Sequence, residues 1–460
     1  MEVVILAAGK GTRMFSALPK VLHAIGGKPM LQRVIATAIE INAKQIHVVV
    51  GFGADKIKAK LGNPGLGQTI NWVMQEEQLG TGHAVQQAAS FINSDDNDNT
   101  ILVLYGDVPL IQASTLIRLL SLADKNSISL LTLATANNQG LGRIIRDENE
   151  DVVAIIEEKD ATEEQRAITE VNSGIMAIPA ARLADWLSRL DNANQQAEYY
   201  LTDIVAKAVQ DGCKINALTI DAENEVQGVN DKTQLAQLER HLQMTNNSKL
   251  IEQGVTLRDP ARVDVRGELN CGQDVEIDVN VIFEGAVTLG NNVSIGANVI
   301  IKDSSIGDGS EILANSNIDG AQIGNETAIG PSARIRPGTV LHNKVKIGNF
   351  VETKNAIIGN GSKANHLAYI GDAEIGENCN IGAGTIFCNY DGANKHKSTL
   401  GNNVFIGSNS VLVAPVSLAD NAFVAAGSAI NSDVPENHLA VGRGKQRNIK
   451  GWKRPTKNQN

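Results

Sequence analysis

An aliphatic residue recurs every six positions through much of the second half of the chain, and this spacing constrains the fold more than any other feature. The runs are Val263, Leu269, Val275, Val281, Val287, Val293 and Val299, then Ile323, Ile329, Ile335, Leu341 and Ile347, then Leu400, Ile406, Leu412, Leu418, Val424 and Ile430. A period of six fits neither the 3.6-residue period of a helix nor the alternation of a simple strand. It is typical of a hexapeptide-repeat parallel β-helix, in which each repeat forms one short face of a coil and stacked aliphatics fill the interior.

The period of six is interrupted at two places, and we expect loops there. The first interruption follows Ile347 and extends to Tyr369, and the second runs from Cys388 to Lys397. A stacked coil accepts insertions as loops along one edge, and such loops often carry binding surfaces. Both interruptions are therefore candidate sites.

The first half of the chain alternates short apolar runs with helical patterns. Strands are predicted at 2–6, 46–50, 70–73, 101–105 and 129–135, and helices at 31–42, 82–92 and 114–124. Alternation of this kind predicts a doubly wound, Rossmann-like α/β sheet. Ligand sites in such a sheet lie beyond the carboxyl ends of the strands.

The pattern changes between Gly228 and Gly254, where three leucines form a helical stripe in a polar segment. We interpret this segment as a linker helix, and a helix that binds a groove is the alternative. A chain of 460 residues is too long for one ordinary core. The predicted domains are residues 1–229 for the α/β domain, 230–252 for the linker helix and 253–460 for the β-helix with its basic tail.

Two predicted strand ends carry residues that could bind phosphate or metal. Small residues from Ala7 to Gly11 follow the first strand and let backbone N–H groups approach a phosphate. A tight strand-to-helix turn explains the same residues equally well. The strand 101–105 leads into Gly106 and Asp107, whose carboxylate could hold a hard cation or form an Asx-turn.

Composition and charge exclude several classes of protein. The 41 Lys and Arg residues against 51 Asp and Glu give a net charge of −10, which argues against a nucleic-acid coat. The chain shows no basic leader and no apolar run that approaches a membrane span. Four cysteines without CxxC spacing are typical of free thiols in a reducing compartment. We therefore expect a soluble cytoplasmic protein, with no nucleic-acid partner and no membrane insertion.

Nearly the whole chain resembles the bacterial bifunctional N-acetylglucosamine-1-phosphate uridyltransferase/glucosamine-1-phosphate acetyltransferases. The first matching motif, Leu6 to Met14, marks sugar-nucleotide pyrophosphorylases in general, whereas its combination with the hexapeptide half is specific. The other matching motifs are Leu18-Pro19-Lys20, Gln75 with Leu79-Gly80-Thr81-Gly82, Tyr105-Gly106-Asp107, Asn172-Ser173-Gly174, Gly228-Val229-Asn230, Arg334-Ile335-Arg336-Pro337-Gly338, Gly361 to His366 and Asn389-Tyr390-Asp391-Gly392.

For the α/β domain, the resemblance implies uridylyl transfer from the co-substrate UTP, with Mg²⁺ as cofactor. Asp107 and Asn230 would coordinate Mg²⁺, since two protein ligands suit an ion that keeps waters and takes phosphate oxygens. Arg13 and Lys20 would act in catalysis by stabilising triphosphate charge during in-line attack by the sugar phosphate. UTP or the UDP-sugar would be bound by Leu6, Ala7, Ala8, Gly9, Lys20, Gln75, Gly80, Thr81, Tyr105, Gly106, Asp107, Gly142, Glu157, Asn172 and Asn230.

For the β-helix, the resemblance implies acetyl transfer from the co-substrate acetyl-CoA to the amine of glucosamine-1-phosphate. His366 would be the general base that takes a proton from the attacking amine. The basic tail is a solvated segment or the binding site of a polyphosphate such as acetyl-CoA. Glucosamine phosphate would be bound by Arg336, Lys354, Tyr369 and Asn380, and acetyl-CoA by Ala383, Asn389, Tyr390, Ser408, Ala426 and Arg443.

The resemblance also implies a left-handed β-helix and a homotrimer with shared acetyltransfer sites, neither of which the spacing itself establishes. Two alternatives come from other classes of protein. One is a regulatory or scaffold subunit that joins a pyrophosphorylase-like domain to hexapeptide repeats. The other is a monofunctional sugar-phosphate nucleotidyltransferase whose β-helix only oligomerises. The joint presence of Arg13, Lys20, Asp107 and Asn230 favours the bifunctional enzyme.

Overall fold

The computed structural model describes residues 1–62 and 70–454, and the chain divides into two compact units, Met1–Leu242 and Gln243–Asn460. Helix α9, Lys232–Glu252, crosses this division. The finer domain bounds given above stay a prediction. In the described ranges, no helix is both long enough and apolar enough to cross a membrane.

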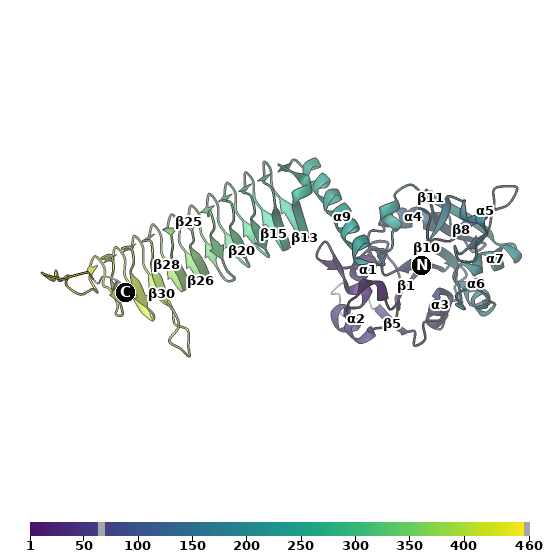
Figure 1. The fold of residues 1–460 in the computed structure, drawn as a ribbon, viewed down its shortest axis with the longest axis horizontal. Helices are drawn as coiled ribbons and strands as arrows, with labels where there is room; N and C mark the ends of the chain where they lie inside the picture. Colours follow the sequence, from purple (N-terminus) through teal and green to yellow (C-terminus); the bar gives the residue numbers. More distant parts are fainter. Residues whose placement is uncertain (63–69, 455–460) are drawn as a thin grey trace, which may run out of the picture. The chain divides into compact units, whose positions relative to one another are not determined.

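A mixed nine-stranded sheet forms the centre of the first unit (Figure 1). Its main path runs β11-β7-β10-β6-β1-β4-β5, and β8 and β9 form an arm attached to β10. Strand β10 is antiparallel to its neighbours β6 and β7, whereas the other pairs along the path are parallel. The bounds are β1 Glu2–Ala7, β4 Ile46–Val50, β5 Ile70–Met74, β6 Thr100–Tyr105, β7 Ser127–Ala134, β8 Arg143–Arg146, β9 Val152–Ile156, β10 Glu170–Pro179 and β11 Lys214–Ile220, with a separate hairpin of β2 Ala24–Ile25 and β3 Lys28–Pro29.

Helices cover both faces of this sheet. In β1, Val3 and Ile5 pack with residues of α1, α2 and α4, whereas Val4 packs with residues of α3, α6 and α7. Successive side chains of a strand point to opposite faces, so a strand that is apolar at every position needs a helical layer on each side. The predicted doubly wound α/β fold is confirmed. The helices are α1 Met30–Glu40, α2 Ala54–Leu61, α3 Thr81–Ala89, α4 Ala113–Ser121, α5 Glu163–Arg166, α6 Ala180–Ser188, α7 Asp203–Gln210 and α8 Glu223–Val226, with short 3-10 turns η1 Thr12–Met14 and η2 Lys20–Leu22.

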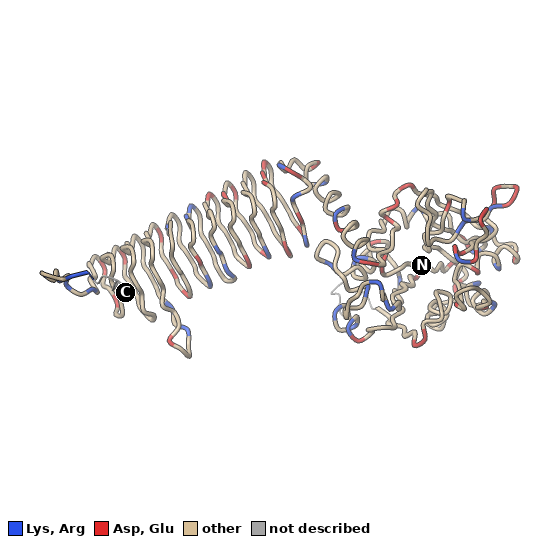
Figure 2. Tube along the Cα trace, in the orientation of Figure 1, with Lys and Arg blue, Asp and Glu red and all other residues tan. Residues whose placement is uncertain are grey.

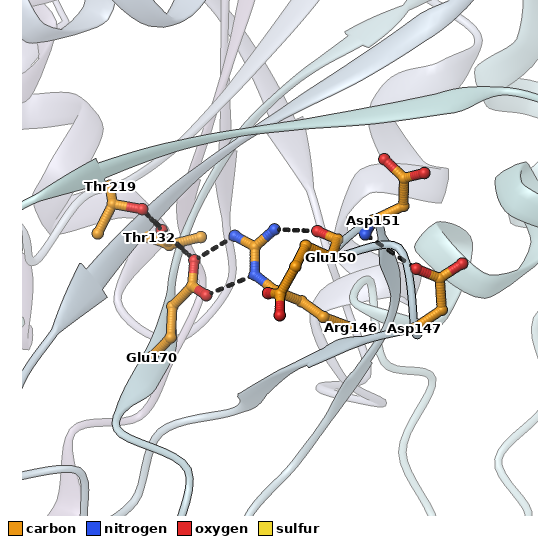
Figure 3. A network of polar contacts seen from close by, with 7 residues as sticks. All are labelled: Thr132, Arg146, Asp147, Glu150, Asp151, Glu170 and Thr219. Carbon is orange, nitrogen blue, oxygen red and sulfur yellow. Dashed lines mark hydrogen bonds and ion pairs between the residues drawn. The ribbon is translucent and has the colours of Figure 1, made fainter.

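An ion pair ties the β8–β9 arm to the main sheet (Figure 3). Arg146 of β8 donates from Nε and Nη2 to the two carboxylate oxygens of Glu170 on β10, each at 2.8 Å. Thr132 of β7 donates to the same carboxylate at 2.9 Å. Two parallel N–H···O bonds fix orientation as well as adding stability. The arm begins just after Gly142 and ends just before Glu157, so this pair helps to place both residues.

The second unit is a parallel β-helix. Val263 pairs with Val281 and Ile300 with Asn317, so one coil takes 18 or 17 residues, which is three hexads or one residue fewer. The rungs stack in one 11-stranded and one 15-stranded sheet (Figure 1). The first contains β12 Thr256–Leu257, β14 Glu276–Ile277, β16 Ser294–Ile295, β19 Glu311–Ile312, β22 Ala328–Ile329, β25 Lys346–Asn349, β27 Lys363–His366, β29 Asn380–Ile381, β32 Phe405–Ile406, β35 Phe423–Val424 and β37 Leu439–Ala440.

The second sheet continues the same coils on their other sides, after the short turn η3 Pro260–Arg262. It contains β13 Val263–Cys271, β15 Val281–Leu289, β17 Ile300–Lys302, β18 Ser305–Ile306, β20 Asn317–Asp319, β21 Gln322–Ile323, β23 Arg334–Ile335, β24 Val340–Leu341, β26 Glu352–Ile358, β28 Tyr369–Ile375, β30 Ile386–Cys388, β31 Ser398–Leu400, β33 Val411–Val413, β34 Val416–Leu418 and β36 Ala429–Ile430.

The aliphatics of the six-residue period fill the interior of the coils. All the predicted positions are buried except Leu269, which is half-buried against the same core. At one corner, Asn280 donates to Asn298 at 2.9 Å, and Asn298 donates to Asn315 at 3.1 Å. These three residues have φ of 60°, 60° and 62°, a left-handed conformation that Asn tolerates better than most residues. The predicted parallel β-helix is confirmed, and its handedness stays a prediction.

The first interruption of the period is not a loop, and that prediction is wrong. Glu352 pairs with Tyr369 one coil later, so a regular 17-residue coil runs through the segment. Thr353 and Ala364 are buried at the interior positions where larger aliphatics were expected. His366 therefore ends strand β27 instead of lying in an inserted loop.

The second interruption is a loop, as predicted. Ala373 pairs with Ser398, a separation of 25 residues where neighbouring coils have 17 or 18. Residues 389–397, which contain the extra length, are called the inserted loop below. Asp391 holds its turn by accepting from the backbone N–H groups of Ala393 and Asn394 and by pairing with His396 at 2.7 Å.

Helix α9 contributes to the core of each unit separately. In the first unit, Leu238 is buried, and Leu235 and Leu242 pack against the same cluster. In the second unit, Gln243 is fully buried and exchanges two hydrogen bonds with the backbone of Val265, at 3.0 and 2.7 Å.

Asn247 is also fully buried on α9 and donates to the carbonyl oxygens of Pro260 and Val263, at 2.6 and 2.8 Å. The first coil has no earlier coil to pair with. Side-chain amides of α9 take over part of that pairing, Gln243 with both a donor and an acceptor and Asn247 with its donor alone.

Candidate functional sites

A pocket of about 240 Å³ lies beyond the carboxyl ends of β1, β5 and β6, where an open α/β sheet binds its ligands. We call it the strand-end pocket. Ten residues predicted to bind UTP line it, together with Val21, Gln78, Ala84 and Glu198. The ten are Leu6, Ala7, Ala8, Gly9, Lys20, Gln75, Gly80, Thr81, Tyr105 and Asp107.

A larger pocket of about 860 Å³ lies beside the β8–β9 arm, and we call it the arm pocket. It is lined by four predicted residues, Arg13, Glu157, Asn172 and Asn230, and by further polar side chains. Two predicted glycines line neither pocket. The carbonyl oxygen of Gly142 accepts from Asn172 N at 2.8 Å, and Gly106 N donates to Leu6 O at 2.9 Å, so both support residues that line a pocket.

Lys20 links the two pockets. Its Nζ forms an ion pair with the Asp107 carboxylate and donates to Asn230 Oδ1 at 3.2 Å. Gly11 has a φ of 61°, and a Cβ there would lie 2.6 Å from Lys20 Cβ. The glycine in the first motif therefore allows the close approach of Lys20. No long helix follows β1 directly, so the residues after Ala7 form a loop that leads to η1.

Asp107 and Asn230 fit the predicted metal site chemically. Their side-chain oxygens converge on one cation, the Lys20 ammonium, although they are far apart in the sequence. A carboxylate and an amide oxygen are ligands that Mg²⁺ accepts, with waters and phosphate oxygens completing its shell. The side chains of Lys20 and Asp107 are only 13% and 19% exposed, so the charges are partly shielded from water.

Glu157 lies in the arm pocket with a partner that the sequence reasoning missed. Thr202 Oγ1 donates to Glu157 Oε1 at 3.0 Å. Burial raises the pKa of Glu157 above its usual range, and the Thr202 hydrogen bond opposes that rise. Thr202 stands at the N-cap of α7, where its hydroxyl would ordinarily cap the helix, but it makes no capping bond. The sequence context of Thr202 thus predicts a helix cap, whereas in the structure its hydroxyl bonds to Glu157.

Gly174 of β10 helps to place Tyr105 of β6 and also Asn172, which lies two residues earlier on β10 itself. Tyr105 is half-buried, and desolvation raises the pKa of its hydroxyl. Asn172 Oδ1 accepts from Gly174 N at 3.0 Å. A Cβ at Gly174, whose φ is 87°, would lie 2.6 Å from the Tyr105 ring, so only glycine allows this packing.

In the second unit, three of the four predicted sugar-phosphate residues lie in or directly after strands of neighbouring coils in the second sheet: Arg336, Lys354 and Tyr369. Arg336 Nη1 donates to Glu352 Oε1 at 2.7 Å, and Lys354 pairs in register with Gly371, two residues after Tyr369. Lys395 of the inserted loop lowers the pKa of Lys354, because the two ammonium groups face each other. Two ammonium groups held close together favour an anion between them. Lys395 was not predicted.

Asn389 connects the inserted loop to these coils. Its Nδ2 donates to Tyr369 Oη at 3.4 Å and to the Asp372 carboxylate. Tyr390, next in the loop, is 61% exposed. Asn380, by contrast, begins β29 in the first sheet and pairs with Lys363.

His366 is exposed at the end of β27 and has a partner that fixes its tautomer. Its Nδ1 lies 2.7 Å from Asn349 Oδ1, on the coil before it. An amide oxygen only accepts, so Nδ1 carries the proton and Nε2 is left as the basic nitrogen. This arrangement suits a general base.

Three predicted acetyl-CoA residues occupy equivalent corners of successive coils. The carbonyl oxygen of Ala383 accepts from Asn409 N at 2.7 Å, and that of Ser408 accepts from Gly427 N at 2.8 Å. Arg443 donates to the carbonyl oxygen of Ala426 at 2.7 Å. The corner therefore carries a small residue on each of three successive coils.

Basic residues follow Arg443 along the C-terminal tail, where Figure 2 shows Lys and Arg close together. Lys445, Arg447, Lys450, Lys453 and Arg454 are exposed, and Lys457 lies outside the described residues. A run of exposed cations at this end of the unit would attract a polyphosphate.

Comparison with protein families matches three regions of the chain. Residues 3–199 match the MobA-like NTP transferase domain, residues 265–358 the GMPPB C-terminal domain, and residues 397–432 the bacterial transferase hexapeptide (six repeats). Among curated relatives, the "Bifunctional protein GlmU" of Marinobacter nauticus, of Stutzerimonas stutzeri and of Pseudomonas entomophila are each 54% identical over 457 residues. In each comparison the match covers 99% of both chains.

Proposed function

This chain belongs to the family of the bifunctional GlmU proteins, and we propose that the residues assembled in its two units carry out the two reactions described here. The protein is a bifunctional transferase of UDP-N-acetylglucosamine synthesis. It transfers an acetyl group from acetyl-CoA to glucosamine-1-phosphate, and then a uridylyl group from UTP to N-acetylglucosamine-1-phosphate, releasing pyrophosphate.

For uridylyl transfer, the observation that carries the residue roles is the contact of Lys20 with both Asp107 and Asn230. Asp107 and Asn230 would hold Mg²⁺, which supplies positive charge to the phosphates of UTP. Lys20 and Arg13 add cationic charge where negative charge gathers on the triphosphate. A reaction of this kind depends on positioning and electrostatics, and it needs no covalent nucleophile.

The sugar phosphate has a suitable place in the arm pocket. Glu157 and Asn172 offer a carboxylate and an amide to sugar hydroxyls and to the N-acetyl group, and Gly142 supports both. From this pocket the phosphate of the sugar reaches toward Asn230 and Lys20, which lie between the two pockets. The bound sugar phosphate therefore faces the phosphates of UTP for in-line attack.

For acetyl transfer, the free Nε2 of His366 takes a proton from the amine of glucosamine-1-phosphate, and the neutral amine attacks the thioester. Arg336, Lys354, Tyr369 and Asn380 hold the sugar phosphate. Acetyl-CoA lies along the corner with Ala383, Asn389, Tyr390, Ser408, Ala426 and Arg443.

We further propose that the protein works in the cytoplasm as a homotrimer assembled through the β-helix. The flat faces of a β-helix suit packing between copies, and both donors, UTP and acetyl-CoA, are charged molecules of the cell interior. Light scattering of the purified chain should give three times its monomer mass. A monomer mass would refute the assembly.

One reaction tests the whole proposal. The protein is incubated with glucosamine-1-phosphate, acetyl-CoA, UTP and Mg²⁺, and UDP-N-acetylglucosamine is measured by chromatography. Omitting acetyl-CoA should stop its formation, and adding N-acetylglucosamine-1-phosphate should restore it. Absence of both activities would favour a scaffold subunit. Nucleotidyl transfer from another nucleoside triphosphate, without any acetyl transfer, would favour a monofunctional enzyme.

A further inference from the structure

The side-chain amide of Gln75 has one fixed orientation at the wall of the strand-end pocket. Gln75 is 3% exposed, and its Nε2 lies 3.2 Å from the carbonyl oxygen of Gly80. A carbonyl oxygen only accepts, so the amide atom that faces it must be the nitrogen. The Gly80 carbonyl is held in place by helix α3, since its oxygen also accepts from Ala84 N at 3.1 Å.

The same nitrogen determines the tautomer of His83. Gln75 Nε2 lies 3.0 Å from His83 Nδ1, on helix α3. The amide has two protons, and because one points to Gly80 the other points to His83. Nδ1 is therefore an unprotonated acceptor, and the ring proton is on Nε2. Gln87 Nε2, one turn further along α3, lies 3.0 Å from His83 Nε2 and 3.3 Å from the carbonyl oxygen of His83. This tautomer therefore requires the Gln87 amide to turn over, so that its oxygen accepts from the Nε2 proton.

Both protons of the Gln75 amide are thus used inside the protein, and its oxygen is what remains for a ligand. Within residues 1–62 and 70–454, Gln75 Oε1 has no hydrogen-bond partner, and Gln75 lines the strand-end pocket. The pocket therefore offers a hydrogen-bond acceptor at this point. A ligand group that meets it must be a donor.

We propose that His83 is a specificity-determining positioning residue, which holds Gln75 so that the pocket selects a pyrimidine with an N–H at position 3. This inference rests on the proposed uridylyl transfer from UTP. Uracil carries a proton on N3, whereas N3 of cytosine is a bare acceptor. To suit cytosine, the Gln75 amide would have to turn over, which would set its oxygen against Gly80 O and against the lone pair of His83 Nδ1.

The test compares UTP with two analogues in steady-state uridylyl transfer to N-acetylglucosamine-1-phosphate. CTP differs at the edge that Gln75 would meet, and 5-methyl-UTP keeps that edge but adds bulk elsewhere. The variants are His83→Leu and His83→Gln, which lack an acceptor at the position of Nδ1, and His83→Asn, whose Oδ1 can replace it. Gln86→Leu is the matched control, because it also loses a hydrogen bond of α3, to Leu187 O, without touching Gln75.

In His83→Leu and His83→Gln, the ratio of kcat/KM for UTP over CTP should fall about tenfold or more, since one of the two bonds that fix the amide is lost. His83→Asn and Gln86→Leu should keep the ratio of the original protein. The ratio of UTP over 5-methyl-UTP should stay unchanged in all four variants.

Three results would overturn the inference. One is an unchanged UTP/CTP ratio in whichever of His83→Leu and His83→Gln folds and turns over UTP. Another is an equal fall in the 5-methyl-UTP ratio, which would indicate a general loosening of the pocket. A third is failure of His83→Asn to restore selectivity. Absence of UTP turnover by the original protein would instead refute the uridylyl transfer itself.

Discussion

Replacing Asp107 by Asn should raise the Mg²⁺ demand of uridylyl transfer, whereas replacing Lys20 by Met should not. The two side chains form an ion pair, and Asn230 contacts the same ammonium. Two readings of Asp107 are therefore possible: it ligates Mg²⁺, or it only positions Lys20. The two substitutions separate these readings, because each removes the ion pair but only one removes the carboxylate.

The expected magnitude follows from the partial burial of the site. At 13% and 19% exposure, an interaction with a charged group contributes about 1.5–3 kcal/mol. Since 1.4 kcal/mol is about tenfold in an equilibrium constant, loss of the carboxylate should raise the half-saturating Mg²⁺ concentration roughly 10- to 100-fold. Lys20→Met keeps both oxygen ligands, so it should lower kcat by about 10²–10³-fold at an unchanged Mg²⁺ requirement.

The assay is a Mg²⁺ titration of uridylyl transfer with UTP and N-acetylglucosamine-1-phosphate, at saturating substrate. Acetyl transfer by the same preparations is the control for the amount of active protein, since it belongs to the other unit, and circular dichroism checks that each variant is folded. Coincident Mg²⁺ curves for the two variants would show that Asp107 acts only through Lys20, and the proposed ligand would be withdrawn.

Three further predictions concern other parts of the chain. His366→Ala should lower kcat of acetyl transfer by about 10²–10⁴-fold and leave uridylyl transfer intact; a loss confined to KM would make His366 a binding residue. Because burial raises the pKa of Glu157, its carboxylate is lost as pH falls through that raised value. Thr202→Val removes the opposing hydrogen bond, so the acid-side rise in KM for N-acetylglucosamine-1-phosphate should begin at higher pH, and superimposable KM–pH profiles would contradict this. Ile329→Ala, at a fully buried position, should destabilise the β-helix by about 2–5 kcal/mol in denaturant titrations, and a change below about 1 kcal/mol would argue against close packing there.

The β-helix was predictable because its period appears directly in the sequence. Each aliphatic of the repeat meets its counterpart one coil later, so local spacing and long-range packing carry the same information. The prediction failed where small residues replaced large ones, at Thr353 and Ala364, although the coil continues through them. The antiparallel course of β10 was not predicted, because strand pairing depends on contacts that a local pattern does not contain.

Some residues of the candidate sites were predicted and others were missed, because a local sequence pattern does not contain contacts between distant residues. Residues at strand ends, such as Asp107, are marked by a motif beside the strand, and most of them line the two pockets. Thr202, His83 and Lys395 were missed, because each acts through a partner distant in sequence or through a tautomer. A threonine before a helix predicts a cap, and only the fold reveals that its hydroxyl turns to Glu157 instead.

The buried amides of Gln243 and Asn247 have a consequence for how far the second unit can extend. The open end of a stack of parallel rungs presents unpaired N–H and C=O groups, the same template on which a cross-β fibril elongates. A side chain on a helix can pair with such a row but offers no new strand for another chain to join. The two amides thus cover part of this edge at the first coil. A chain shortened to begin after Glu252 would expose the unpaired backbone groups of the first coil, and we expect such chains to self-associate by strand pairing at that edge.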